Sequence, residues 1–159
     1  MASKVYVETS IFSFYYDERE SPAIVARRAW TREWWDTHRH RYNNITSLEV
    51  MGELAAGQKP HRAKAHAMAG TLPAVSFAPE DEVIVEVYIR HRLMPQDPLA
   101  DAVHLALASR HNCDYLRTWN CQHLANPQKF PHIRAINAML GLHMPTLVTP
   151  LELLGLKPE

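Results

Sequence analysis

Cysteine is scarce in this chain of 159 residues, which contains only Cys113 and Cys121. Two cysteines are too few for a disulfide framework, and there is no pair of CxxC motifs that would indicate a zinc site. We therefore expect both thiols to be free, as is usual for a protein of the reducing cytoplasm.

Neither sign of charge predominates, because 17 Lys and Arg residues balance 17 Asp and Glu residues. Any contact with a nucleic acid therefore has to be local. Long hydrophobic runs are also missing, since none reaches the ~18 residues of a membrane-spanning helix. The strand-like start of the chain soon meets Glu8 and other polar residues, so we expect no signal peptide, no membrane partner and a cytoplasmic protein.

Internal repeats, linkers and low-complexity tracts are absent as well. Hydrophobic residues make up 47% of the chain, which is ample for a sizeable core. Domains of ~100–150 residues are the commonest, so we expect residues 1–159 to form one domain. The ten histidines include no HExxH pair that would predict a zinc enzyme.

The segment formed by residues 97–126 organises the rest of the chain. It predicts a buried helix, a tight turn, a short strand over residues 115–118 and a polar loop. Asp97 suits the N-cap of this helix and Pro98 its first position, and apolar residues follow on most sides. Asp101 nevertheless lies in the first turn, where a buried carboxylate is costly unless something pairs with it or the site opens to water.

Strand-like and helix-like segments alternate along the chain. Strands are expected at residues 4–7, 44–46, 74–77, 115–118 and 146–149. Helices or helical turns are expected at residues 11–16, 48–56, 60–69 and 132–140. Four more are expected to begin at Pro22, Pro79, Pro98 and Pro150. This alternation predicts an α/β fold with a mostly parallel sheet of four or five strands and right-handed crossovers.

Capping residues and apolar stripes refine three of these helices. Thr9 or Ser10 can cap the turn at 11–16, and Ser47 can cap the helix at 48–56, which Gly57 ends. The expected buried faces are formed by Ala23, Ala26, Trp30 and Trp34 in one helix and by Val83, Ile84, Val87 and Tyr88 in another.

Four polar residues are expected at one edge of this sheet. Glu8 ends the first strand, Glu53 lies on the helix after the second, Asp101 begins the buried helix, and Asn120 follows the fourth strand. Their oxygens are hard ligands that suit Mg²⁺ or Mn²⁺. A divalent ion would relieve the repulsion between the carboxylates and could activate a water for attack on a phosphodiester.

Each acidic residue also has a structural interpretation. Glu8 could cap a turn, Glu49 and Glu53 could form a solvated helix face, and Asp114 could serve the turn before the fourth strand. Trp119 is better explained by packing than by base stacking. Five arginines could solvate one face or bind RNA phosphates, namely Arg27, Arg28, Arg32, Arg39 and Arg41.

Four segments together resemble PIN-domain proteins, and in particular the VapC-type toxins of bacterial toxin–antitoxin pairs. They are V-Y-V-E-T-S, T-S-L-E-V-M-G-E-L, A-D-A-V-H-L-A-L-A and D-Y-L-R-T-W-N-C-Q-H-L-A-N. The resemblance extends over nearly the whole chain, and D-A-x-H-x-A and T-W-N-x-x-H-L-A-N are its specific parts.

The resemblance implies a three-layer α/β/α sandwich with strand order 3-2-1-4-5. It also implies Mg²⁺- or Mn²⁺-dependent cleavage of RNA, leaving a 5′-phosphate and a 3′-hydroxyl, with a small antitoxin and a second copy of the chain as partners. The acidic site residues of the family fall on Glu8, Glu53 and Asp101, and the last site position falls on Asn120. Thr9 or Ser10 would assist near Glu8.

Two positions depart from the family pattern. Glu8 stands where Asp is usual, and its extra methylene moves the carboxylate by roughly a bond length, although catalytic geometry is sensitive at ~1 Å. Asn120 stands where many members have Asp. A second hypothesis is therefore a catalytically impaired PIN-like domain that binds RNA or protein. A third, a receiver-like signalling domain, would be expected to supply a lysine after its last strand, and the only late lysine is Lys157.

Overall fold

Five short parallel strands form the centre of the computed structural model, which describes residues 2–57, 61–97 and 99–154. The strands are β1 (Lys4–Val7), β2 (Asn43–Ser47), β3 (Ala74–Val75), β4 (Tyr115–Arg117) and β5 (Thr146–Val148). They lie in the order β3-β2-β1-β4-β5, and every neighbouring pair is parallel. The predicted sheet and its order are thus confirmed.

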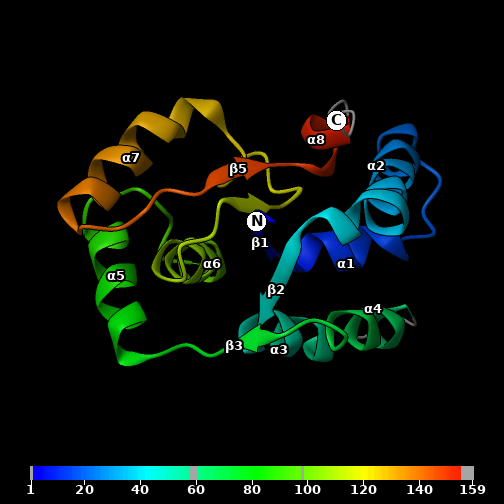
Figure 1. The fold of residues 1–159 in the computed structure, drawn as a ribbon, viewed down its shortest axis with the longest axis horizontal. Coiled ribbons are helices and arrows are strands. Elements are labelled where there is room, and N and C mark those ends of the chain that lie inside the picture. Colours follow the sequence, from blue (N-terminus) through cyan, green and yellow to red (C-terminus); the bar gives the residue numbers. More distant parts are fainter. Residues whose placement is uncertain (1, 58–60, 98, 155–159) are drawn as a thin grey trace.

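Helices cover both faces of this sheet. They are α1 (Thr9–Tyr15), α2 (Pro22–Glu33), α3 (Leu48–Ala56), α4 (Arg62–Ala69), α5 (Pro79–Arg90), α6 (Ala100–Arg110), α7 (Phe130–Met139) and α8 (Pro150–Leu154), with short helical turns at Trp34–His38, Arg39–Arg41 and Pro127–Lys129. Helices α5, α6 and α7 lie on one side and α1 and α2 on the other (Figure 1), which gives the three predicted layers. No helix within the described residues is long and apolar enough to cross a membrane.

The core is centred on β1 and α6. Val5, Tyr6 and Val7 are fully buried, as expected of a strand in a parallel sheet that is covered on both faces. Helix α6 is buried along most of its length, including Ala102 and Leu105. The prediction of a buried helix that carries an acidic residue in its first turn is therefore confirmed.

Two predicted helix starts are wrong. Helix α6 begins at Ala100 after Leu99, not at Asp97, and its N-cap makes no side-chain hydrogen bond. Pro98 lies outside the described residues. Helix α1 begins at Thr9 with Glu8 as its extended N-cap, so neither Thr9 nor Ser10 caps it, and the chain turns directly from β1 into α1.

The predicted apolar faces of α2 and α5 are only partly correct. Val83 is 58% exposed, and the buried residues of α5 are Asp81, Ile84, Val85 and Tyr88, which follow helical spacing. Asp81 can occupy this face because its carboxylate binds Arg110 at 2.5 Å. In α2, Ala23 is exposed and Ala26 and Trp30 are half-buried, whereas Trp34, just beyond the helix, is fully buried.

Smaller differences affect lengths only. Strand β3 ends at Val75 rather than at residue 77, and α4 begins at Arg62, whereas Pro60 lies outside the described residues.

Both cysteines are free, as predicted. Trp119 is buried and its indole N–H donates to Thr31 Oγ1 at 2.7 Å, so it packs in the core.

Candidate active site

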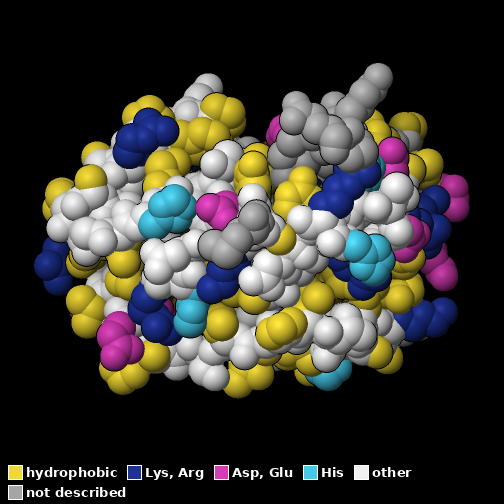
Figure 2. Space-filling view, viewed as in Figure 1, with side chains coloured by type: hydrophobic (Ala, Val, Ile, Leu, Met, Phe, Trp, Pro, Cys, Tyr) yellow, Lys and Arg dark blue, Asp and Glu magenta, His cyan; other side chains and the backbone are white. Residues whose placement is uncertain are grey.

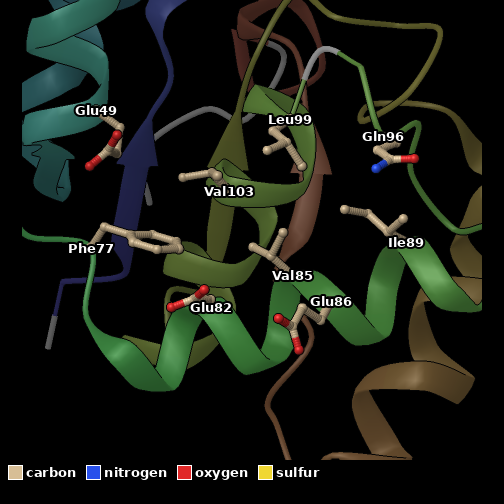
Figure 3. Close-up of a pocket in the computed structure, with 9 residues that line it drawn as sticks. All are labelled: Glu49, Phe77, Glu82, Val85, Glu86, Ile89, Gln96, Leu99 and Val103. Carbon is tan, nitrogen blue, oxygen red and sulfur yellow. The ribbon is translucent and has the colours of Figure 1, made fainter.

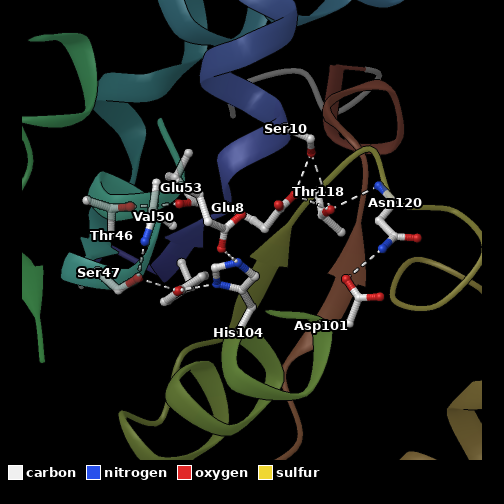
Figure 4. Close-up of polar contacts among 12 residues, drawn as sticks. Glu8, Ser10, Thr46, Ser47, Val50, Glu53, Asp101, His104, Thr118 and Asn120 are labelled. Carbon is white, nitrogen blue, oxygen red and sulfur yellow. Dashed lines mark hydrogen bonds and ion pairs between the residues drawn. The ribbon is translucent and has the colours of Figure 1, made fainter. Parts of the chain in front are cut away.

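Glu8 lies at the junction between β1 and α1, where the sheet opens at its carboxyl edge. The residue is 8% exposed. Its Oε1 accepts hydrogen bonds from Ser10 Oγ at 2.5 Å and from Thr118 Oγ1 at 2.6 Å. These two hydroxyls, one from α1 and one from the end of β4, fix the carboxylate at this edge (Figure 4).

Glu53, on α3, faces the same point from the neighbouring helix. Its Oε1 lies 2.6 Å from His104 Nε2 of α6. Burial opposes ionisation of Glu53, but the hydrogen bond and charge of His104 outweigh it and lower the pKa of the carboxyl. Burial also disfavours the charged imidazole, yet the carboxylates of Glu53, Glu8 and Asp101 raise the pKa of His104.

Asp101 and Asn120 form a second pair beside the first. Asn120 Nδ2 donates to Asp101 Oδ1 at 2.8 Å, and Asp101 is 9% exposed. Asn120 Oδ1 accepts instead from the backbone N–H groups of Gln122 and His123, at 3.3 and 3.0 Å. The amide oxygen expected to ligate a metal is therefore occupied by the loop backbone, and Asn120 contacts Asp101 through its amide nitrogen.

Thr118 connects the two pairs. Its hydroxyl donates to Glu8 and accepts from the backbone N–H of Asn120 at 3.0 Å. The structure therefore brings Glu8, Glu53, Asp101 and Asn120 to one edge of the sheet, as the order of segments predicted.

The donor set fits a hard divalent cation. Ligand atoms of Glu8, Glu53 and His104 lie within 4.8 Å of one another. Two carboxylates so close together repel each other, and a cation between them would remove that cost. Among the described residues, no lysine or arginine forms an ion pair with Glu8 or Asp101. Carboxylate oxygens are the ligands that Mg²⁺ and Mn²⁺ prefer.

Thr9 and Ser10, predicted to assist, both lie at the site. Ser10 Oγ binds Glu8 and also accepts from the backbone N–H of Trp119 at 2.8 Å, which ties α1 to the end of β4. Thr9 is 7% exposed and, with Glu8 and Glu53, lines a depression of about 470 Å³.

Arg27 and Arg28, predicted to bind substrate, have partners within the protein. The Arg27 guanidinium lies over the rings of Trp119 and Phe14, at 5.2 and 5.7 Å from their centroids. Arg28 Nη1 donates to the backbone oxygen of Asp17 at 2.5 Å. Their assignment to substrate stays a prediction, and the structure does not place either residue among those lining the depression.

Two arginines, Arg19 and Arg62, line the depression beside the acids, together with His61. Arg19 is also bound to Asp17, with Nη2 2.6 Å from Oδ2. Arg62 folds across Gly57, where a Cβ would lie 2.5 Å from Arg62 Nε, so the glycine makes room for the arginine. The charge of Arg62 contributes to the lowered pKa of Glu53.

Glu49 does not join the site, although it lies four residues before Glu53. It faces a separate groove of about 490 Å³ between α3, α5 and α6 (Figure 3). That groove has apolar walls, including Phe77 and Val85, and two further acids, Glu82 and Glu86. Glu49 and Glu53 are both partly exposed on α3, but they line different hollows, and Glu53 is bound to His104.

A model of the PIN domain matches residues 5–120. The chain belongs to the PIN domain family. That match covers β1 to the loop after β4, and so includes all four acidic and amide residues described above.

Two solved structures are similar to this chain, and the first supports the fold. VapC20 of Mycobacterium tuberculosis, a toxin that cleaves the sarcin–ricin loop, superposes with a TM-score of 0.54 at 17% identity, over 70% of this chain and 86% of that one. VapBC2 of Rickettsia felis, bound to a DNA fragment from its promoter, gives a TM-score of 0.49 at 13% identity over 92% and 96%. No curated protein sequence matches the chain.

Sequence reasoning missed two residues of the site, His104 and Thr118. His104 lies three residues after Asp101, a spacing that places both on one side of a helix. That spacing could have indicated His104. Thr118 ends the segment expected as the fourth strand, and its contact with Glu8 depends on the pairing of β1 with β4.

Proposed function

We propose that this protein is a Mg²⁺- or Mn²⁺-dependent endoribonuclease and the toxin of a toxin–antitoxin pair. One observation carries the proposal: carboxylate oxygens of Glu8 and Glu53 lie close together, beside Asp101, at the carboxyl edge of a PIN-family sheet. The proposed partners are an RNA substrate, a small antitoxin and a second copy of the chain, and the proposed location is the cytoplasm.

Each residue has a distinct part in the proposed site. Glu8, Glu53 and Asp101 would hold the cation, directly or through water, and Asn120 would hold Asp101 in place through its amide N–H. A bound divalent ion supplies a water nucleophile at neutral pH and stabilises negative charge on the phosphodiester. Ser10 and Thr118 keep Glu8 oriented toward the other carboxylates, and Arg62 provides positive charge in the adjoining depression for RNA phosphates.

Cleavage of structured RNA tests the proposal. Purified protein should cut a panel that includes tRNA and a ribosomal hairpin when Mn²⁺ or Mg²⁺ is present, leaving 5′-phosphate ends, and EDTA should stop it. Asp101→Ala should lower the rate at least about 100-fold, as expected when a charge-stabilising group is removed. Cleavage that is unchanged in Asp101→Ala would refute this mechanism.

A second candidate function follows from Glu8. Its longer side chain, in place of the usual Asp, leaves the alternative of a PIN-family domain that binds RNA or a protein partner without cutting. Under this alternative the native protein is inert with both metals but still binds RNA, and robust native cleavage excludes it.

A further inference from the structure

A buried chain of hydrogen bonds connects the start of α3 to Glu53, further along the same helix. Ser47 Oγ caps α3 by accepting from Val50 N at 3.1 Å. Tyr6 Oη lies 2.7 Å from Ser47 Oγ and 2.7 Å from His104 Nδ1. His104 Nε2 lies 2.6 Å from Glu53 Oε1. Figure 4 shows the side chains of Ser47 at the end of β2, His104 on α6 and Glu53 on α3 converging.

The direction of these hydrogen bonds follows from the chemistry of the groups. The Glu53 carboxylate only accepts, so His104 Nε2 must donate to it. Nε2 donates to Glu53 whether the imidazole is neutral or protonated. In the neutral form Nδ1 accepts from the Tyr6 hydroxyl, which in turn accepts from Ser47, whose oxygen accepts from the backbone of Val50. Every donor is used once. With its proton on Nε2, His104 has no lone pair there for a metal ion.

This series of hydrogen bonds is buried at the Tyr6 end and exposed to solvent at the Glu53 end. Tyr6 is fully buried and His104 is 1% exposed, whereas the Glu53 side chain is 35% exposed. A half-exposed carboxylate would otherwise sample several rotamers, and the contact with a buried imidazole holds it in one. Because Tyr6 belongs to β1, the chain also fixes Glu53 relative to Glu8, two residues after Tyr6.

We propose that His104 is a positioning residue for Glu53, oriented by Tyr6 and Ser47, and that it is not itself a metal ligand. This inference rests on the proposed function, because Glu53 is there assigned to the cation. His104 acts by presetting the Glu53 carboxylate toward Glu8, so that less rotamer freedom is lost when a cation binds.

Mn²⁺ titration by calorimetry tests the role of His104. His104→Gln keeps an N–H donor at about the reach of Nε2 and should bind Mn²⁺ within ~3-fold of native, whereas His104→Leu should weaken binding ~10–100-fold, as loss of an outer partner of a metal ligand does. In the Glu53→Ala background, His104→Leu should add little. If His104→Leu binds Mn²⁺ like native, or His104→Gln is as weak as His104→Leu, the inference is wrong.

Two tyrosines provide a matched pair. Tyr6→Phe removes the hydroxyl that orients His104 and should weaken Mn²⁺ binding ~3–10-fold, less than loss of the imidazole itself. Tyr88→Phe also removes a fully buried hydroxyl, one that donates to Asn137 Oδ1 at 2.6 Å, but Tyr88 lies on α5 outside the chain to Glu53. Its Mn²⁺ affinity should equal that of native protein. Equal weakening in both variants would indicate a general loss of stability and overturn the inference.

A metal-free measurement separates this inference from the proposed function. If native protein neither binds Mn²⁺ nor cuts RNA, the proposed function fails. The hydrogen-bond chain is then judged by NMR in the native protein. A slowly exchanging imidazole N–H resonance of His104, lost in Glu53→Ala and exchanging faster in Tyr6→Phe than in Tyr88→Phe, supports positioning. Its absence from native protein overturns positioning.

Discussion

At the scale of single residues, the structure explains how a glutamate serves at position 8. Its Oε1 accepts hydrogen bonds from the hydroxyls of Ser10 and Thr118. Both hydroxyls lie within reach of a glutamate, whose side chain is one methylene longer than that of aspartate. We expect Glu8→Asp to withdraw the carboxylate by roughly a bond length and to lower the cleavage rate about 100-fold, because a 1 Å misplacement can cost that much. Single-turnover cleavage at saturating Mn²⁺ measures this.

Thr118→Val serves as the control for Glu8→Asp, because it removes one of the two hydroxyls but leaves the glutamate. It should lower the rate by a smaller factor. Faster cleavage by Glu8→Asp than by native protein would contradict this account of Glu8 and favour the catalytically impaired PIN-family domain.

At the scale of elements, the loop between α1 and α2 depends on Asp17. Its carboxylate accepts from the backbone and side chain of Arg19, and mainly the side-chain hydrogen bond lowers the pKa of Asp17 to about 2. A free Asp has a pKa of ~3.9. The contribution to stability is therefore fully present above about pH 4 and is lost as the pH falls through about 2.

Asp17→Asn should consequently lower the Tm at pH 6 and by much less at pH 2, where a pKa of about 2 leaves much of the carboxyl protonated. Arg19 is 58% exposed, so solvent screens the pair. We expect a shift of about 2–4 °C, which corresponds to ~1 kcal/mol in a protein of this size. Circular dichroism at pH 6, 4 and 2 measures it. Glu20→Gln, an exposed acid in the same loop, should leave the Tm unchanged. An equal shift of Asp17→Asn at pH 2 and pH 6 would contradict an ionic contribution.

At the scale of the whole molecule, zero net charge requires that RNA be held locally. On the face shown in Figure 2, Lys and Arg side chains lie at several separate points rather than in one continuous patch. The depression that Glu8 and Glu53 line also carries cationic side chains, including Arg62. In the Asp101→Asn background, which should bind RNA without cutting it, Arg62→Gln should reduce the salt slope of RNA binding by about 1.

Two arginines outside the depression provide comparison variants for the salt slope of RNA binding. Arg134 is exposed on α7, in the opposite layer from α1 and α2 (Figure 1), and Arg134→Gln should leave the salt slope unchanged. Arg27→Gln discriminates between two RNA paths. If it reduces the slope and Arg62→Gln does not, RNA lies along α2 and the path through the depression is wrong. Fluorescence anisotropy at several salt concentrations provides the slopes.

The sequence by itself determined the elements and the edge at which the acids meet. Alternating strands and helices require a parallel sheet, and residues that directly follow its strands, such as Glu8 and Asn120, meet at one edge of that sheet. The buried helix with an acid in its first turn could also be predicted, because apolar residues lie on most of its sides.

Only the tertiary structure decided which atoms meet. Contacts between residues far apart in the chain decide three features of the site. They are the first residues of α1 and α6, the partner of Glu53 and the orientation of the Asn120 amide. The same holds for Arg117, fully buried with its guanidinium 4.0 Å from the centre of the Trp34 ring. Local patterns report which face of an element is apolar, whereas hydrogen bonds between elements depend on distances set by the packing of the whole core.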